Sequence, residues 1–269
     1  MTNINFSNIH PEAEIGKDVV ISPFVTIHKN VKIGDGTWIG PNVVIMEGAR
    51  IGKNCKIFPG AVISAIPQDL KYQGEETYVE IGDNTTIREC VTINKGTKAR
   101  GLTSIGSNCL IMCYAHIAHD CEVGNNVIVG AYVGMAGEVK VDDFANIAGG
   151  TLIHQFVHIG GHVIIQGGSK VSKDVPPYIR AGREPLSYAG INTIGLRRRN
   201  FSNEKIEEIH EIYRWIYQKG LNNSDAIKYI KENLPQTSER DIIISFIENS
   251  KRGIIKGYFD RIKNEDDEF

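Results

Sequence analysis

Two histidines, an aspartate and a cysteine lie close together in the stretch AHIAHDC, which runs from Ala115 to Cys121. A histidine followed by an aspartate can act as a general base whose ring is oriented by the carboxylate. The same residue types bind metals, and all of them also occur on ordinary protein surfaces. To choose between a general base, a metal site and ordinary surface residues, the secondary structure that carries this stretch must be known.

The chain is built on a repeat of six residues. Isoleucine occurs at every sixth position from Ile9 to Ile63, and the frame returns at residues 81–93 and 105–171, where only valine or methionine replaces it. A helix with 3.6 residues per turn would scatter these side chains around its surface. A short strand and a tight corner every six residues instead predict a prism of parallel β coils.

The position four residues after each of these isoleucines holds a small residue, with Pro67 as the exception. Because side chains alternate along an extended segment, this residue and the next isoleucine both point inward. Cys55, Cys109 and Cys121 occupy this inward position. A thiol there packs as a small hydrophobe, so we expect Cys121 to take no part in chemistry and no disulfides to form.

The repeat resembles that of the hexapeptide-repeat proteins, which implies a left-handed parallel β-helix with three hexads in each coil of eighteen residues. The expected fold class is therefore mainly β, with a β-helix over residues 1–190 and a small α-helical domain over residues 191–269. Residues 65–80 and 99–104 lack inward isoleucine and should form loops or irregular edges. Pro176 and Pro177 should end the coils, because neither can donate to a strand ladder.

Helical patterns follow in the C-terminal part of the chain. Ser202 should cap a helix over residues 203–219, Ser224 should precede a second helix that ends before Pro235, and Ser238 should precede a third that runs to about residue 252. We expect these helices to cover the open edge of the last coil.

The spacing of eighteen places Gly137 directly above His119, about 5 Å away. A residue without a side chain leaves room for a substrate against the imidazole, and its N–H could stabilise an oxyanion. Asp120 could orient the imidazole ring. We therefore interpret His119 as a candidate general base that faces out of the prism, together with His116 and Asp120.

Two other patterns leave alternatives open. Cys113, Ala131, Gly149 and Gly167 should stack at one corner, where they could form a groove for an acyl or pantetheine chain or could simply ease corner packing. The basic run at residues 197–199 could clamp a phosphate or begin a solvated helix.

A metal site is the least favoured interpretation. His154, His158 and His162 are four residues apart, a spacing that aligns side chains on a helix but not on a β coil. The chain has 30 Lys and Arg against 32 Asp and Glu, which gives no basic field for nucleic acid. No apolar run approaches the roughly 20 residues that span a bilayer, and no signal peptide is evident, so we expect a cytoplasmic protein.

Several segments together resemble one family, the UDP-N-acetylglucosamine O-acyltransferases that use acyl carrier protein. These segments are QDLKY (68–72), IRECVTINKGT (87–97), AHIAHDC (115–121), VDDFA (141–145), HQF (154–156), DVPPY (174–178) and GLRRRNF (195–201). The resemblance implies transfer of a 3-hydroxyacyl chain to the 3-hydroxyl of UDP-N-acetylglucosamine, the first step of lipid A biosynthesis. It also implies a homotrimer with active sites between the prisms, and no metal or cofactor.

The resemblance also implies roles for individual residues. His119 matches the general base, Asp120 its partner and Gly137 the oxyanion donor. Gly167 matches the position that sets acyl-chain length, where a glycine should admit a chain of at least about fourteen carbons. The residues that match substrate contacts are Gln68, Asp69, Lys71, His116, His154 and Gln155, with Asn192, Arg198 and Arg199 toward the nucleotide and phosphates.

Three positions depart from the family pattern. Glu138 and Asn94 stand where histidines often occur, and Ile194 stands where a carboxylate can contact the uracil. Alternatives to the expected reaction are acylation of an amino analogue of the same nucleotide sugar, a later N-acyltransferase of lipid A synthesis, a zinc carbonic anhydrase and a purely structural β-helix.

Overall fold

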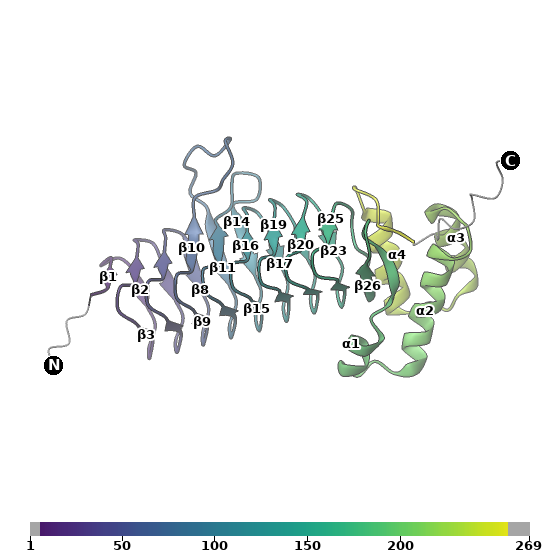
Figure 1. Ribbon diagram of the computed structural model, residues 1–269, viewed down its shortest axis with the longest axis horizontal. Helices are drawn as coiled ribbons and strands as arrows, with labels where there is room; N and C mark the ends of the chain where they lie inside the picture. The colour runs from purple at the N-terminus through teal and green to yellow at the C-terminus, as the bar shows by residue number, and fades with distance from the viewer. Residues whose placement is uncertain (1–5, 258–269) are drawn as a thin grey trace.

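The computed structural model describes residues 6–257 as a long prism of parallel β coils with helices at its C-terminal end (Figure 1). The described strands form three sheets, one on each side of the prism. Sheet A contains β1 (Asn8–Ile9), β4 (Thr26–Ile27), β7 (Val44–Ile45), β10 (Val62–Ala65), β13 (Thr92–Asn94), β16 (His116–Ile117), β19 (Gly134–Met135), β22 (Leu152–Ile153) and β25 (Lys170–Val171).

The other two sheets follow the same coils. Sheet B contains β2 (Glu14–Ile15), β5 (Lys32–Ile33), β8 (Ala49–Ile51), β11 (Tyr78–Ile81), β14 (Leu102–Ile105), β17 (Glu122–Val123), β20 (Lys140–Val141) and β23 (His158–Ile159). Sheet C contains β3 (Val20–Ile21), β6 (Trp38–Ile39), β9 (Lys56–Ile57), β12 (Thr86–Ile87), β15 (Leu110–Ile111), β18 (Ile128–Val129), β21 (Asn146–Ile147), β24 (Ile164–Ile165), β26 (Ile179–Gly182), β27 (Ser187–Ile191) and β28 (Lys256–Gly257).

Strand pairing confirms the predicted spacing of eighteen. His116 pairs with Gly134, and Ile27 pairs with Ile45. The isoleucines of the repeat are buried along most of the prism, and so are Cys55, Cys109 and Cys121. The first coil is the exception, because Ile15 has no coil beneath it and is 36% exposed. The predicted inward positions are therefore correct for the body of the prism.

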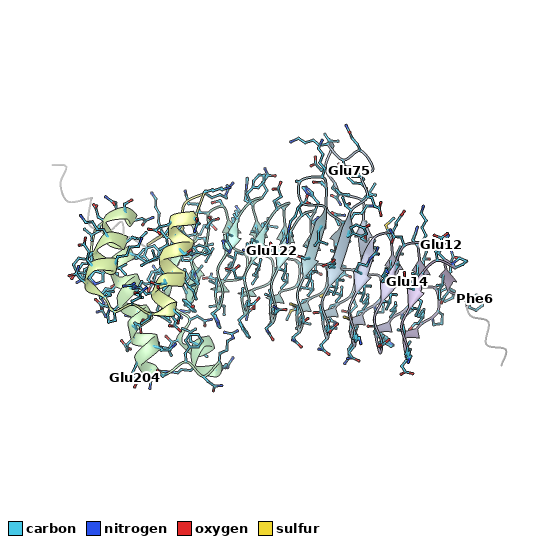
Figure 2. All side chains as sticks on the ribbon, turned by 180° about the vertical axis from the view of Figure 1, so that it is seen from behind. Phe6, Glu12, Glu14, Glu75, Glu122 and Glu204 are labelled. Atoms are coloured by element: carbon cyan, nitrogen blue, oxygen red, sulfur yellow. The ribbon has the colours of Figure 1, made fainter. Side chains whose placement is uncertain are left out.

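The two breaks in the repeat form loops at neighbouring coils. Residues 66–77 form the larger loop, which projects from the prism and carries Glu75 (Figure 2). Residues 95–101 form a shorter loop beside it. The ends of both breaks instead lie in strands, because Tyr78 of β11 pairs with Leu102 of β14. The expectation of loops is thus confirmed for the middle of each break, while the ends widen sheet B.

The prediction that Pro176 and Pro177 end the coils was wrong. Strand β26 pairs in parallel with β24 after the two prolines, and β27 then turns back antiparallel to it. The prolines lie between the bridge at Val175 and the start of β26, so they occupy a corner and remove no ladder hydrogen bond.

Four described helices follow the sheets: α1 (Thr193–Arg198), α2 (Asn203–Tyr217), α3 (Asn223–Asn233) and α4 (Ser238–Asn249). The first was not predicted. Ser202 caps α2 as predicted, but Asn222 and Thr237 cap α3 and α4 in place of Ser224 and Ser238. The helices cover the last coil, where the hydroxyl of Tyr213 donates to the carbonyl of Pro177 at 2.7 Å. The expected domain boundary between residues 190 and 191 falls within β27, and the division stays a proposal.

Candidate active site

His119 lies at the corner between β16 and β17, with its side chain 18% exposed. Its Nδ1 atom is 2.8 Å from Oδ2 of Asp120. With the ring proton on Nδ1, the imidazole donates to this carboxylate and keeps a lone pair on Nε2. This arrangement can accept a proton from a substrate at Nε2 while the carboxylate holds the ring in place.

Asp120 is buried, contrary to the expectation that it faces solvent. Its carboxylate is covered by the 95–101 loop. Oδ1 accepts hydrogen bonds from the N–H groups of Thr97 at 3.0 Å and Arg100 at 3.2 Å, and Oδ2 accepts the Thr97 hydroxyl at 2.7 Å. The six-residue repeat correctly predicted that the Asp120 side chain points out of the prism core. Nothing in the repeat indicated that the 95–101 loop would cover this side chain.

Gly137 lies over the imidazole of His119, as the spacing of eighteen predicted. A Cβ atom at this glycine would be 2.5 Å from Cε1 and 2.6 Å from Nε2 of His119. Any side chain at residue 137 would therefore displace the ring. Within the described residues, the Gly137 N–H donates to no protein acceptor, which leaves it available to a ligand.

A cavity of about 440 Å³ surrounds these groups on the outer face of sheet A. It is lined by Gln68, His116, His119, Gly134, Met135, Gly137, Leu152 and Gln155, among others. Three of the predicted substrate contacts, Gln68, His116 and Gln155, thus share a cavity with His119. Asp69 and Lys71 follow Gln68 on the 66–77 loop but do not line the cavity, and His154 is exposed beside Gln155.

The orientation of the His116 ring is fixed by a hydrogen bond between Nδ1 and the Thr92 hydroxyl at 2.8 Å. Burial lowers the pKa of His116 below its usual value, so the ring stays neutral near pH 7. A neutral, anchored imidazole beside His119 can offer a hydrogen bond to a polar substrate group without adding a charge.

The predicted nucleotide contacts lie elsewhere. Asn192, Arg198 and Arg199 line a cavity of about 920 Å³ on the outer face of sheet C, beside β18, β21 and β24. Asn192 also accepts from the Gly195 N–H as the cap of α1. Arg199 donates to the carbonyls of Gly195 and Phe144, and burial lowers its pKa. Arg198 is exposed, so its guanidinium is the freer of the two for an anion.

The structure therefore does not bring all predicted site residues together within one chain. The His119 cavity opens on sheet A, whereas the Arg198 cavity opens on sheet C, and these are different sides of the prism.

Comparison with known proteins supplies the family. A family model described as UDP N-acetylglucosamine O-acyltransferase, domain 2, matches residues 174–255, and one for bacterial transferase hexapeptide repeats matches residues 30–65 and 102–137. An acyl-[acyl-carrier-protein]–UDP-N-acetylglucosamine O-acyltransferase from Pseudomonas syringae is 43% identical over 70% of this chain and 73% of its own length. The chain belongs to this acyltransferase family.

Solved structures agree with the assignment. LpxA, a UDP-N-acetylglucosamine acyltransferase from Bacteroides fragilis, is 56% identical with a TM-score of 0.91, over 93% of this chain and 98% of its own. The Francisella novicida UDP-N-acetylglucosamine acyltransferase is 38% identical with a TM-score of 0.92, over 98% and 99% of the two chains. The expected fold class is confirmed: this acyltransferase is a left-handed parallel β-helix with a small C-terminal helical region.

Of the small residues predicted at one corner of the acyltransferase, Gly149 and Gly167 are exposed, whereas Cys113 and Ala131 are half-buried. A Cβ atom at Gly149 would be 2.9 Å from the carbonyl oxygen of Ala131, and one at Gly167 would be 3.1 Å from that of Gly149. The part of this corner at Gly149 and Gly167 is thus a strip of backbone without side chains. Its use as an acyl groove stays a prediction.

The three departures from the family pattern occupy different environments. Glu138 is exposed at the corner next to Gly137, and Ile194 is 68% exposed at the rim of the sheet C cavity. Asn94 is 2% exposed and donates to the carbonyl of Ile66 at 3.0 Å. Asn94 therefore anchors the base of the 66–77 loop, while the Glu138 side chain is exposed to solvent.

The three histidines four residues apart have separate neighbours. His158 contacts Asp142 at 2.8 Å, and His162 stacks between the rings of Phe144 and Tyr178. Burial, with a smaller contribution from Arg199, lowers the pKa of His162 to about 4. Within residues 6–257, no three His, Cys, Asp or Glu side chains gather as a metal site, and no helix is long and apolar enough to cross a membrane.

Proposed function

We propose that this acyltransferase moves a 3-hydroxyacyl chain from acyl carrier protein to the 3-hydroxyl of UDP-N-acetylglucosamine, the first step of lipid A biosynthesis. The names of its relatives support the substrates, since they are acyl-carrier-protein-dependent UDP-N-acetylglucosamine O-acyltransferases. The observation that carries the chemistry is the His119–Asp120 pair beneath Gly137 in a substrate-sized cavity.

In the proposed mechanism, Nε2 of His119 takes the proton from the sugar hydroxyl as its oxygen attacks the thioester carbonyl carbon. The negative charge that develops on the carbonyl oxygen is stabilised by the N–H of Gly137. Asp120 stabilises the imidazolium that forms. When the tetrahedral intermediate collapses, the C–S bond breaks, and the imidazolium returns its proton to the leaving thiolate of the carrier. Base, orientation and oxyanion support suffice, so we propose no metal or cofactor.

The remaining predicted residues receive binding roles in this proposal. Gln68, His116 and Gln155 contact the acceptor sugar or the pantetheine around His119, and their place in one cavity supports this assignment. Asp69, Lys71 and His154 act at the rim of that cavity. Asn192, Arg198 and Arg199 act on the nucleotide and its phosphates, which is supported by the three arginines, Arg180, Arg198 and Arg199, that line the sheet C cavity.

We propose that the acyltransferase is a homotrimer, and the three sides of the prism support this. The outer face of sheet B is charged, with ion pairs of 2.9 Å between Lys32 and Glu14 and between Arg100 and Glu122. Glu14 lies near the N-terminal end of the prism and Glu122 nearer the helices (Figure 2). The outward positions of sheets A and C carry few charges, namely Lys170, Lys56 and Arg180, and include the apolar side chains Val44, Val62, Leu152, Trp38, Leu110, Ile128 and Ile164.

A trimer would pack sheet A of each copy against sheet C of the next and leave sheet B to solvent. It would also bring the Arg198 cavity of one copy toward the His119 cavity of its neighbour, which explains why a single chain separates them. Acyl carrier protein would approach these clefts from outside. The expected cytoplasmic location stays a prediction.

The trimer can be tested by sedimentation equilibrium, which should give three times the chain mass of 29.8 kDa. Val44→Arg, which places a charge on the outer face of sheet A away from the His119 cavity, should shift the population toward monomer and lower activity with it. Ser104→Arg, on the outer face of sheet B, should leave the mass unchanged. A monomeric wild-type protein with full activity would contradict the proposal.

The reaction and the chain length can be tested in one assay. UDP-N-acetylglucosamine or its 3-amino analogue is supplied with 3-hydroxyacyl carrier proteins of increasing length. We expect O-acylation, with a preference for chains of at least about fourteen carbons because Gly167 adds no side chain to the strip. Gly167→Met should shift the preference to shorter chains, while turnover of a short donor is retained. Preference of the wild type for ten carbons, or for the amino acceptor, would refute the respective part of the proposal.

A further inference from the structure

The 95–101 loop forms most of the hydrogen-bonding environment of the Asp120 carboxylate. Thr97 supplies both its N–H, at 3.0 Å from Oδ1 and 3.1 Å from Oδ2, and its hydroxyl, at 2.7 Å from Oδ2. Oδ2 is also the atom that contacts Nδ1 of His119 at 2.8 Å. Thr97 is 6% exposed, and the carboxylate side chain is fully buried. Thr97 therefore helps to set the orientation of the Asp120 carboxylate, and the carboxylate in turn orients the His119 ring.

The loop itself is anchored to the coils around it. The N–H of Lys95 donates to the carbonyl of Ala65 at 2.9 Å, and the N–H of Gly96 donates to that of Tyr78 at 3.2 Å. A Cβ atom at Gly96 would be 2.2 Å from the backbone nitrogen of Leu102, so the segment lies flat against β14. On the other side, the hydroxyl of Thr103 accepts the N–H of Asp120 at 2.8 Å. Thr97 is therefore a fixed donor and not part of a loosely placed loop.

We propose that Thr97 is a positioning residue for the His119–Asp120 pair, an inference that rests on the proposed function. Burial of a carboxylate is costly unless it is hydrogen-bonded, and hydrogen bonds to a charged group are worth more than neutral ones. The Thr97 hydroxyl fixes the rotation of the carboxylate, so that one lone pair of Oδ2 points at Nδ1 of His119. Thr97 lies just before the break in the six-residue repeat at residues 99–104, and the break itself adds the Arg100 N–H to the same carboxylate.

Valine and serine at residue 97 separate the hydroxyl from the shape of the side chain. Thr97→Val should lower kcat about 10- to 100-fold, which corresponds to loss of a hydrogen bond to a charged group. KM for both substrates should change by less than about 3-fold, because Thr97 touches neither. Thr97→Ser keeps the hydroxyl and should restore most of kcat. A Thr97→Ser variant as impaired as Thr97→Val would contradict the role of the hydroxyl.

Thr85→Val is the matched control. Thr85 is a buried threonine like Thr97, and its hydroxyl donates to the carbonyl of Gly106 at 2.8 Å, away from the His119 cavity. The hydroxyl of Thr97 also accepts the Ala99 N–H at 3.1 Å, so thermal denaturation of both variants measures the structural cost. We expect similar losses of Tm in the two variants but a loss of kcat in Thr97→Val alone.

A double-mutant cycle with Asp120→Asn completes the test. If Thr97 acts through the carboxylate, Thr97→Val should cost little further activity once Asp120 is replaced. An equal loss of kcat in both backgrounds would assign Thr97 a general structural role and overturn the inference. Absence of acyl transfer in the wild type would refute the proposed function instead, whereas an active wild type with an unimpaired Thr97→Val variant would refute this inference alone.

Discussion

Replacing His119 with alanine should lower kcat of the acyl transfer by about 100-fold or more, because general-base catalysis by a positioned side chain contributes about that much. The imidazole has its Nδ1 bound to Asp120 and its Nε2 turned toward Gly137, which leaves Nε2 to accept the proton. Steady-state kinetics with UDP-N-acetylglucosamine and a 3-hydroxyacyl carrier protein give kcat and KM separately.

His28→Ala is the matched control for this variant. His28 follows an inward isoleucine of the first coils and is exposed, far along the prism from the cavity. Its replacement should leave kcat unchanged. Near-normal turnover of His119→Ala would show that the hydroxyl is activated by another group, and His116 in the same cavity would be the next candidate.

Replacing Gly137 with alanine should reduce activity about as severely as removing His119. The added methyl group would lie 2.5 Å from Cε1 and 2.6 Å from Nε2 of the imidazole, far inside van der Waals contact. Because the backbone of the coil is fixed by its strand pairing, the ring must rotate away. That rotation breaks the 2.8 Å contact with Asp120 and removes Nε2 from the substrate. A misplacement of about 1 Å can cost about 100-fold in rate.

Gly161→Ala provides a comparison on a neighbouring coil. The closest atom to its added Cβ would be the carbonyl oxygen of Asp143 at 3.2 Å, a tight contact that small shifts can relieve. We expect Gly161→Ala to retain activity and Gly137→Ala to lose it, with both variants folded as judged by circular dichroism. A fully active Gly137→Ala enzyme would mean that the imidazole works from a different rotamer.

The body of the prism could be predicted because its constraints are periodic. Every coil repeats the same inward pair of positions, so one frame identified Cys121 as a core residue and placed Gly137 over His119. The same argument failed at the ends of the repeat. Pro176 and Pro177 were predicted to end the β coils. In the structure they occupy a corner, and the chain continues into β26 and β27.

The environment of Asp120 could not be predicted by the same means. The repeat assigned Thr97, four residues after Ile93, to an inward position, and the residues of the break at 99–104 did not indicate where the loop would lie. Its conformation depends on acceptors from other coils, among them the carboxylate of Asp120 and the carbonyls of Ala65 and Tyr78. The residues next to Thr97 in the sequence do not indicate that its hydroxyl would bind the Asp120 carboxylate, so sequence reasoning did not identify Thr97 as a site residue.

The sequence by itself determined the register of the coils, and with it the meeting of His119, Asp120 and Gly137. Backbone hydrogen bonds between equivalent positions of successive coils leave only one register that keeps the isoleucines inside. Only the tertiary structure decided that Asp120 is buried beneath the 95–101 loop, and that the cavities of His119 and Arg198 open on different sides of the prism. The burial of Asp120 and the positions of the two cavities depend on contacts between segments that are not equivalent positions of the repeat. A period of six residues constrains only equivalent positions, so it could not predict these contacts.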